Sequence, residues 1–263
     1  MMAAKAPVKI LLLVTGSIAA VKVGLLVDQL FEDPCQIRIA STRSAFHFLT
    51  RAQQSVRDFP LHRVLTDDDE WKEWQGMNDA VMHIELRRWA DLVVIAPLDA
   101  NTLAKLSNGL CDNLVTCVMR AWEVKQKPVI VCPAMNTAMW THPVTAKQLS
   151  TLRDWYAHTS PDSPLSDAAD DDVSATGQLP DTFEKALFQI VGPVRKRLAC
   201  GDIGIGGMAP VEDIAKVIRH TMGIIRSRRP NGTSLETDAV EQQEQQQLKE
   251  PHGASSVKNS QNE

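Results

Sequence analysis

Three short stretches of the sequence contain side chains that could do chemistry next to a ligand. CPAMNTAMW, residues 132–140, places Asn136 between two methionines directly after an apolar run. An amide can donate hydrogen bonds to a carboxylate, although asparagine is also common in ordinary turns. His83 lies in VMHIELRRW and Cys200 in the glycine-rich ACGDIGIGG. A thiol in a movable segment can give or take a proton over a substrate; a structural role is the alternative for each.

Small polar side chains follow several predicted strands. The run VKILLLVT ends in TGSIAA, where Gly16 allows close backbone approach and Ser17 is suited to cap a helix. Two further runs end in Thr42 and in the segment 99–102. Each turn alone is explained as an ordinary helix cap. The carboxyl ends of parallel strands nevertheless share one edge of a sheet, where open α/β sheets bind ligands, so the sequence predicts a cofactor crevice there.

The glycine pattern favours a mononucleotide over a dinucleotide. The fingerprint G-x-G-x-x-G is absent from TGSIAA. A loose match at residues 204–209 lacks the following strand with an acidic residue that the fingerprint requires. We interpret that second segment as a mobile glycine loop.

Apolar runs alternate with helical patterns along the chain. Strands are expected at 8–15, 36–42, 91–97, 128–134 and 186–194, and helices at 18–32, 44–49, 83–90, 101–122, 145–156 and 211–226. This order predicts an α/β fold with a parallel sheet and helices on both faces. We expect one domain over residues 1–226, interrupted by a polar, solvated insertion at 157–182 and followed by a disordered tail at 227–263.

Composition excludes several classes of protein. The 263 residues are 44% hydrophobic and 23% charged with a net charge of -4, which gives no electrostatic footprint for nucleic acid. The first apolar run, KILLLV, is too short for a signal peptide, and none approaches the length of a membrane span. The sequence therefore predicts a cytoplasmic protein.

Cysteines and acidic runs give no metal-site signal. The five cysteines are odd in number and lack paired metal-ligand spacing. We expect buried, inert thiols at the four that lie in or beside apolar segments, namely Cys35, Cys111, Cys117 and Cys132. The acidic runs 67–69 and 170–172 lack the glycine and the terminal glutamate of a calcium loop, so we expect solvated loops there.

Taken together, these stretches resemble the phosphopantothenoylcysteine decarboxylases of the flavin-dependent cysteine decarboxylase superfamily, which includes the halotolerance proteins of plants and yeast. The resemblance is carried, in family order, by TGSIAA, DDDEWKEW, HIELRRWADLVVIAPLDANTLAKLSNGLCDNL, CPAMNTAMW and KRLACGD. It implies a Rossmann-like, flavodoxin-type, three-layer fold with bound FMN, and a homotrimer with active sites between subunits. The implied reaction converts 4'-phospho-N-pantothenoylcysteine to 4'-phosphopantetheine with loss of CO2, a step of coenzyme A biosynthesis.

The resemblance also implies roles for individual residues. His83 would be the catalytic base, Cys200 the proton donor and Asn136 the ligand of the substrate carboxylate. Further substrate contacts are implied for Met139, Arg197, Leu198, Ala199 and Met208. FMN contacts are implied for Gly16, Ser17, Ile18, Thr42, Arg43, Ser44, Asp99, Ala100, Asn101, Thr102 and Met135. Asp99 stands where serine is often found in the family.

Two other functions are open within the same resemblance. Some fungal relatives divide the catalytic residues between subunits and act as inhibitory subunits of a protein phosphatase. The presence of His83, Asn136 and Cys200 in one chain favours a self-sufficient enzyme. Flavin prenyltransferase-like and lantibiotic cysteine decarboxylases share the fold, but ACGD and HIELRRWADL favour the coenzyme A enzyme.

Overall fold

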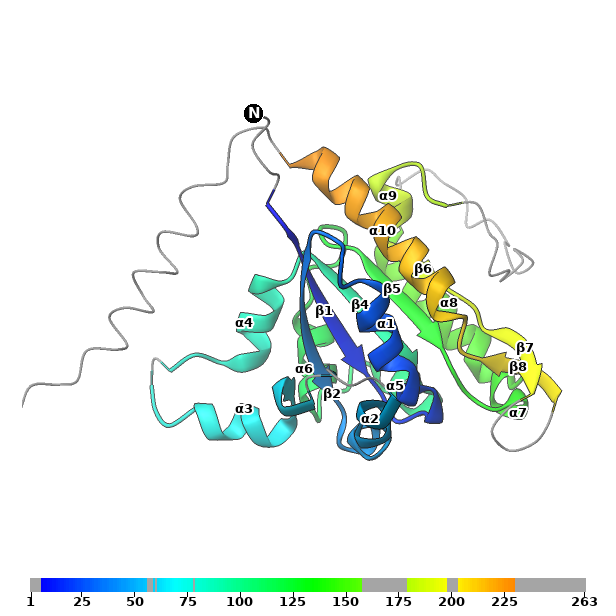
Figure 1. The fold of residues 1–263 in the computed structure, drawn as a ribbon, viewed down its shortest axis with the longest axis horizontal. Coiled ribbons are helices and arrows are strands. Elements are labelled where there is room, and N and C mark those ends of the chain that lie inside the picture. Colours follow the sequence, from blue (N-terminus) through cyan, green and yellow to red (C-terminus); the bar gives the residue numbers. More distant parts are fainter. Residues whose placement is uncertain are drawn as a thin grey trace, which may run out of the picture. The chain divides into compact units, whose positions relative to one another are not determined.

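A parallel sheet with the strand order β3-β2-β1-β4-β5-β6 forms the centre of the structure (Figure 1). The computed structural model describes residues 6–55, 59, 61–77, 79–157, 179–197 and 203–229. Residues 7–228 make up one unit, and nearly all of a second unit (1–6 and 229–263) lies outside the described residues. The strands are β1 (Val8–Val14), β2 (Cys35–Ser41), β3 (Val64–Leu65), β4 (Leu92–Leu98), β5 (Val129–Pro133) and β6 (Phe188–Ile190).

The strand order confirms the predicted fold class. With the short edge strand β3 set aside, β2-β1-β4-β5-β6 is the flavodoxin-like order, and with β3 included it is the classical Rossmann order. All five strand pairings within this sheet are parallel. The order reverses between β1 and β4, and ligands of open α/β sheets bind outside the carboxyl ends of the strands at such a switch point.

Two hydrophobic layers hold the sheet between helices. Along β1, Ile10 and Leu12 contribute to one layer, while Leu11 and Leu13 contribute to the other, because successive side chains of a strand point to opposite faces. Burial on both faces explains the nearly continuous apolar run in the sequence. The fold is therefore a three-layer α/β sandwich, as expected.

Helices from separate parts of the chain cover each face. The first layer packs against η1 (Ile18–Lys22), α1 (Val23–Gln29), α2 (Arg43–Ser55) and α10 (Val211–Arg228). The second packs against α4 (Met82–Trp89), α5 (Ala100–Ser107), α6 (Leu114–Ala121) and α8 (Pro143–Tyr156). The shorter elements are η2 (Leu61–Arg63), α3 (Asp67–Glu73), α7 (Thr137–Trp140) and α9 (Phe183–Ala186).

Several expectations from the sequence need correction. The helical pattern at 101–122 forms two helices, because Asn108 ends α5 by donating its side-chain amide to the Ala104 carbonyl at 2.7 Å. Asn113 then starts α6 by accepting from the backbone N–H of Thr116 at 3.0 Å. The acidic run 67–69 is the first turn of α3 rather than a loop, where carboxylates favour the positive end of the helix dipole.

The glycine segment is also more regular than expected. Residues Ile203–Gly207 form strand β8, which pairs antiparallel with β7 (Val194–Arg197) in a separate two-stranded sheet. The interpretation of 204–209 as a mobile loop was therefore wrong, because β7 satisfies its backbone hydrogen bonds. Most of the insertion, nearly all of the tail and the run 170–172 lie outside the described residues.

Among the residues that the structure describes, no helix combines the length and the apolar character that crossing a bilayer requires.

Candidate active site

The turns after β1 and β4 are joined by a buried threonine. The Thr15 hydroxyl donates to the Pro97 carbonyl oxygen at 2.8 Å and accepts from the Asp99 backbone N–H at 2.8 Å. Thr15 has no solvent exposure. The two strand ends on either side of the switch point are thereby held at a fixed separation.

The turn after β2 meets the same place. A Cβ atom added to Gly16 would collide with Ser44 Oγ and would stand 3.0 Å from Asp99 Oδ2. Thr42 and Ser44 share a hydrogen bond between their hydroxyls at 3.1 Å. Three strand-end turns therefore converge here, and only glycine at position 16 leaves room for them.

The polar groups at this edge fit a phosphorylated mononucleotide such as FMN. Ser17 and Asp99 are the N-caps of η1 and α5, so two helical segments direct their first backbone N–H groups toward this edge. The hydroxyl of Ser41 is buried and has no hydrogen-bond partner among the described residues. An unpartnered buried hydroxyl is a group that a bound ligand would satisfy.

A cavity of about 400 Å³ opens beside these turns. Its lining joins residues from η1, the end of β5 and the β7–β8 hairpin, which are distant in sequence. The described lining residues include Ser17, Ile18, Met135, Asn136, Arg197 and Met208. Six residues predicted from the sequence for cofactor or substrate are thus brought together.

Asn136 is oriented by its own helix. Its side-chain oxygen caps α7 by accepting from the Met139 backbone N–H at 3.0 Å. The NH2 group of the same amide is thereby left to donate elsewhere, since an amide has both an acceptor and donors. The turn-forming role and the ligand-binding role of Asn136 are therefore compatible.

The β7–β8 hairpin closes against the residues that follow β5. The Met135 backbone N–H donates to the Gly206 carbonyl oxygen at 2.9 Å. Gly206 has a φ of 135°, and a Cβ atom there would collide with the Met135 carbonyl oxygen. The glycine-rich sequence of β8 therefore reflects close backbone approach beside Asn136.

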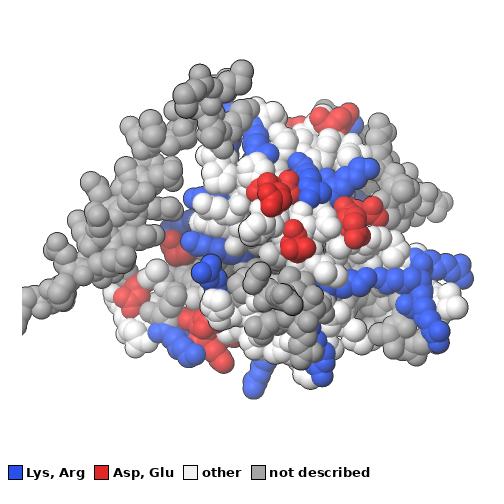
Figure 2. Space-filling view, viewed as in Figure 1, with Lys and Arg blue, Asp and Glu red and all other residues white. Residues whose placement is uncertain are grey.

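Cationic side chains line one part of the cavity, which the sequence reasoning missed apart from Arg197. Lys22 and Lys196 also line it, and Lys and Arg side chains gather over the β7–β8 hairpin (Figure 2). Lys196 Nζ donates to the Met208 carbonyl oxygen at 2.7 Å. Burial, and then the nearby charge of Lys22, lower the pKa of Lys196. The run of three cations in VRKR, just before the ACGD segment, was the signal available in the sequence.

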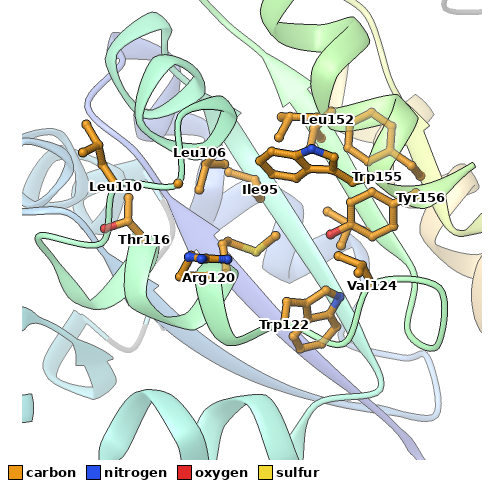
Figure 3. Close-up of a pocket in the computed structure, with 15 residues that line it drawn as sticks. Ile95, Leu106, Leu110, Thr116, Arg120, Trp122, Val124, Leu152, Trp155 and Tyr156 are labelled. Atoms are coloured by element: carbon orange, nitrogen blue, oxygen red, sulfur yellow. The ribbon is translucent and has the colours of Figure 1, made fainter.

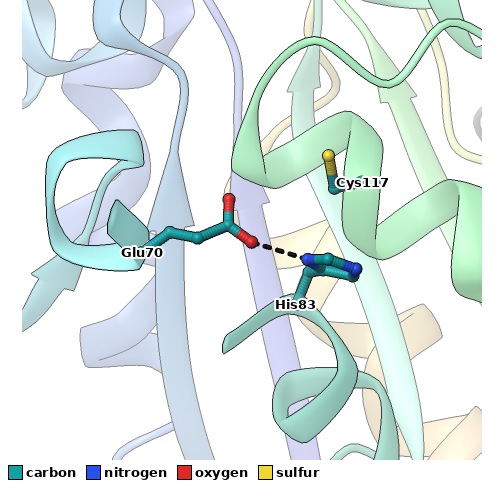
Figure 4. Close-up of side chains that lie close together, drawn as sticks. All are labelled: Glu70, His83 and Cys117. Atoms are coloured by element: carbon teal, nitrogen blue, oxygen red, sulfur yellow. Dashed lines mark hydrogen bonds and ion pairs between the residues drawn. The ribbon is translucent and has the colours of Figure 1, made fainter. Parts of the chain in front are cut away.

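His83 lies in a different cluster, on the α4 side of the sheet (Figure 4). Its Nδ1 atom is 2.6 Å from Glu70 Oε1. Ligand atoms of Glu70, His83 and Cys117 lie within 4.8 Å of one another. The described residues that line the Asn136 cavity do not include His83, so the part of one chain that the structure describes does not bring the predicted base and carboxylate ligand into a shared cavity.

The remaining predicted residues have separate outcomes. Met139 is on α7 with 54% of its surface exposed, outside the described lining of the cavity. Leu198, Ala199 and Cys200 lie outside the described residues.

The prediction of buried, inert thiols is right for one cysteine and wrong for another. Cys132 is buried as expected, and burial raises its pKa, whereas Cys111 is exposed, contrary to expectation.

A second cavity, of about 390 Å³, lies between α5, α6, α8 and the sheet (Figure 3). Its lining is mainly apolar and aromatic, with Trp122, Trp155 and Tyr156 among the side chains. The described lining contains none of the residues predicted for substrate or cofactor, so we assign the chemistry to the Asn136 cavity.

The fold, the crevice at its switch point and the adjoining cavity define a nucleotide-binding α/β protein, and comparison with known proteins identifies its class. The sequence profile of the Flavoprotein family matches residues 3–223. Phosphopantothenoylcysteine decarboxylase of Mus musculus is 43% identical over 216 residues, which cover 81% of this chain and 87% of the mouse protein. The chain therefore belongs to the phosphopantothenoylcysteine decarboxylase family of flavoproteins.

Solved structures agree. A cysteine-to-serine variant of a PPC decarboxylase in complex with pantothenoylaminoethenethiol is 38% identical, with a TM-score of 0.63 over 81% of this chain and 97% of that chain. The FMN-binding protein AtHal3 is 39% identical, with a TM-score of 0.60 over 82% of this chain and 96% of that chain.

Proposed function

We propose that this chain is an FMN-dependent decarboxylase that converts 4'-phospho-N-pantothenoylcysteine to 4'-phosphopantetheine in coenzyme A biosynthesis. The observation that carries the proposal is the Asn136 cavity. It combines the Asn136 NH2 group, which has no partner among the described residues, as a donor for a carboxylate with the cations Lys22, Lys196 and Arg197 for a phosphate. The names of the similar proteins support the same reaction.

FMN would be held at the convergent strand ends. Ser17, Thr42, Ser44 and the first turn of α5 would supply donors, and Gly16 would allow the backbone to approach. Ile18 and Met135 line the adjoining cavity from the same edge. When bound there, FMN supplies reversible two-electron oxidation of the substrate thiol, which makes loss of CO2 feasible.

The side chains of the protein would then orient the substrate and move protons. Asn136 would hold the carboxylate, with its own orientation fixed by the bond from Met139. His83 would remove the proton of the substrate thiol, and Cys200 would return a proton after decarboxylation. Met139, Leu198, Ala199 and Met208 would complete the substrate contacts.

The separation of His83 from the described lining of the Asn136 cavity supports active sites between subunits, and the family resemblance implies that the oligomer is a homotrimer. In that arrangement, His83 of one copy completes the cavity of the next. We also propose a cytoplasmic location, since the described cysteines are free thiols, as is usual in a reducing compartment. The alternative of an inhibitory phosphatase subunit is not favoured, because His83, Asn136 and Cys200 all occur in this one chain.

The reaction is tested by incubating the purified protein with 4'-phospho-N-pantothenoylcysteine and following products by mass spectrometry. We expect loss of CO2 and formation of 4'-phosphopantetheine. The Cys200→Ser variant should stop at an oxidised, decarboxylated product, because its proton donor is missing. FMN-loaded protein that leaves the substrate unchanged would contradict the proposal.

A further inference from the structure

We propose that Glu70 is a positioning residue for His83, and that the two side chains work as a dyad in which the carboxylate fixes the imidazole for proton transfer. The inference deepens the proposed function and rests on it. It concerns a residue on α3, an element that the sequence did not predict.

The geometry defines the tautomer of His83. Its Nδ1 atom lies 2.6 Å from Glu70 Oε1, and the side chains are 27% and 9% exposed, respectively. A carboxylate only accepts hydrogen bonds, so Nδ1 carries the hydrogen and donates it. In the neutral imidazole, Nε2 is then the atom that can take a proton. The dyad therefore leaves one defined nitrogen of His83 available as a base.

Glu70 is held firmly by the start of α3. The backbone N–H and the hydroxyl of Thr66 both donate to Asp69 Oδ2, at 2.9 and 2.7 Å. Asp67 Oδ1 accepts from the Leu114 backbone N–H at 2.7 Å, which joins α3 to α6. The helix that carries Glu70 is thus fixed at its first turn, and a buried carboxylate on a fixed helix can orient a neighbouring ring.

A metal site is the other interpretation of this cluster, because glutamate, histidine and cysteine are all zinc ligands. Two observations favour the dyad. Glu70 and His83 already bond directly to each other. The Cys117 Sγ atom donates to the Cys111 carbonyl oxygen at 3.4 Å, so this thiol already has a backbone partner.

The dyad predicts a selective loss of turnover. The neutral imidazole becomes a cation when it accepts a proton, and an adjacent carboxylate both stabilises that cation and keeps the ring in place. Without Glu70 the ring is free to rotate away from the reacting atom. A misplacement of about 1 Å typically costs about 10²-fold in rate.

The experiment compares Glu70→Ala and Glu70→Gln with the parent. We expect Glu70→Ala to lower kcat about 10- to 100-fold with KM and FMN content unchanged. Glu70→Gln keeps an oxygen that accepts from His83 Nδ1, so its kcat should lie between those of Glu70→Ala and the parent. Asp33→Asn is the matched control, since Asp33 is also paired, at 2.9 Å from Arg219 on α10, which packs in the other hydrophobic layer from α4. Its kcat should equal that of the parent.

A second readout is independent of activity. In the parent, ¹⁵N NMR of histidine should assign the hydrogen of neutral His83 to Nδ1, using His83→Gln to identify the signals, and Glu70→Ala should shift it toward Nε2. If the parent is active and Glu70→Ala has the same kcat and the same His83 tautomer as the parent, the inference about Glu70 is overturned and the proposed function stands. An inactive parent would refute the function, while the tautomer would still test the dyad. Bound zinc in the purified protein, with an equal loss in Cys117→Ser, would overturn the dyad in favour of a metal site.

Discussion

The Asn136 cavity and the Glu70–His83 cluster differ in how their polar groups are satisfied. In the cavity, the Asn136 oxygen is bonded within its own turn while the NH2 group remains available. Two lysines stand close enough for Lys22 to lower the pKa of Lys196, an arrangement that an anion would relieve. In the cluster, Glu70 and His83 satisfy each other at 2.6 Å.

This difference separates two tasks. We propose that the cavity receives an anionic ligand, whereas the cluster orients a base. Because the described residues of one chain do not unite them, we infer that a second copy of the chain brings them together. The predictions below test each side of the comparison.

The largest effects are expected for the two principal side chains. His83→Gln should lower kcat about 10²- to 10⁴-fold, the usual contribution of a general base. Asn136→Ala should raise KM as well as lower kcat, because the carboxylate loses its donor in both the ground state and the transition state. Steady-state kinetics distinguishes a fall in kcat alone from a combined change in KM and kcat. The same kinetic pattern in both variants would contradict the proposal that His83 is the base and Asn136 the carboxylate ligand.

The hairpin over the cavity is tested by Gly206→Ala. A Cβ atom there meets the Met135 carbonyl oxygen at a φ of 135°, so backbone strain of about 1–3 kcal/mol should displace β8 and raise KM about 10-fold. Gly223→Ala is the matched control, since a Cβ atom on that α10 glycine meets nothing within 4 Å. Equal KM values in the two variants would show that β8 does not bound the substrate.

The cationic part of the cavity is tested by pH. Lys196 binds an anion while protonated, and its pKa is lowered, so KM should rise with pH earlier than an ordinary lysine would predict. Lys196→Gln should raise KM about 10-fold and remove this dependence, whereas Lys185→Gln, in an exposed ion pair with Asp181, should change nothing. A pH dependence that persists in Lys196→Gln would assign it to another group.

The smallest effect is expected at the start of α3. Thr66→Ala removes the hydroxyl bond to Asp69 and should lower the free energy of unfolding by about 1 kcal/mol, with a slight fall in kcat because α3 carries Glu70. Thr151→Ala, at a half-buried site within α8, serves as the reference in thermal melts. Equal melting temperatures would show that this bond does not stabilise α3.

The sequence was sufficient for five of the six strands of the central sheet, but not for its edge strand β3 or for the Glu70–His83 cluster. Periodic apolar runs such as 8–14 and 92–98 identify buried strands because burial on both faces leaves few other options. The turns containing Gly16, Asp99 and Asn136 were predicted at the correct edge, since parallel strands align their carboxyl ends. The order of the elements alone is therefore enough to predict that these turns lie at the same edge of the sheet.

The contacts that were missed depend on packing between distant segments. Glu70 and His83 meet only because α3, attached to α6 through Asp67, lies beside α4. The acidic run 67–69 resembles a solvated loop when its helix-capping partner Thr66 is not considered. Likewise, Lys22 and Lys196 approach each other only when the hairpin closes toward η1. No local pattern encodes such pairings.

The central claim, that two copies of the chain complete each active site, is tested most directly by mixing variants. His83→Gln and Asn136→Ala would be purified separately, mixed under conditions that allow subunits to exchange, and assayed for decarboxylation of 4'-phospho-N-pantothenoylcysteine. The account predicts that the mixture regains a substantial fraction of the parent activity, since some interfaces then pair an intact His83 with an intact Asn136. Subunit exchange would be verified by mass spectrometry. If exchange has occurred and the activity of the mixture stays at the level of the separate variants, the claim is contradicted.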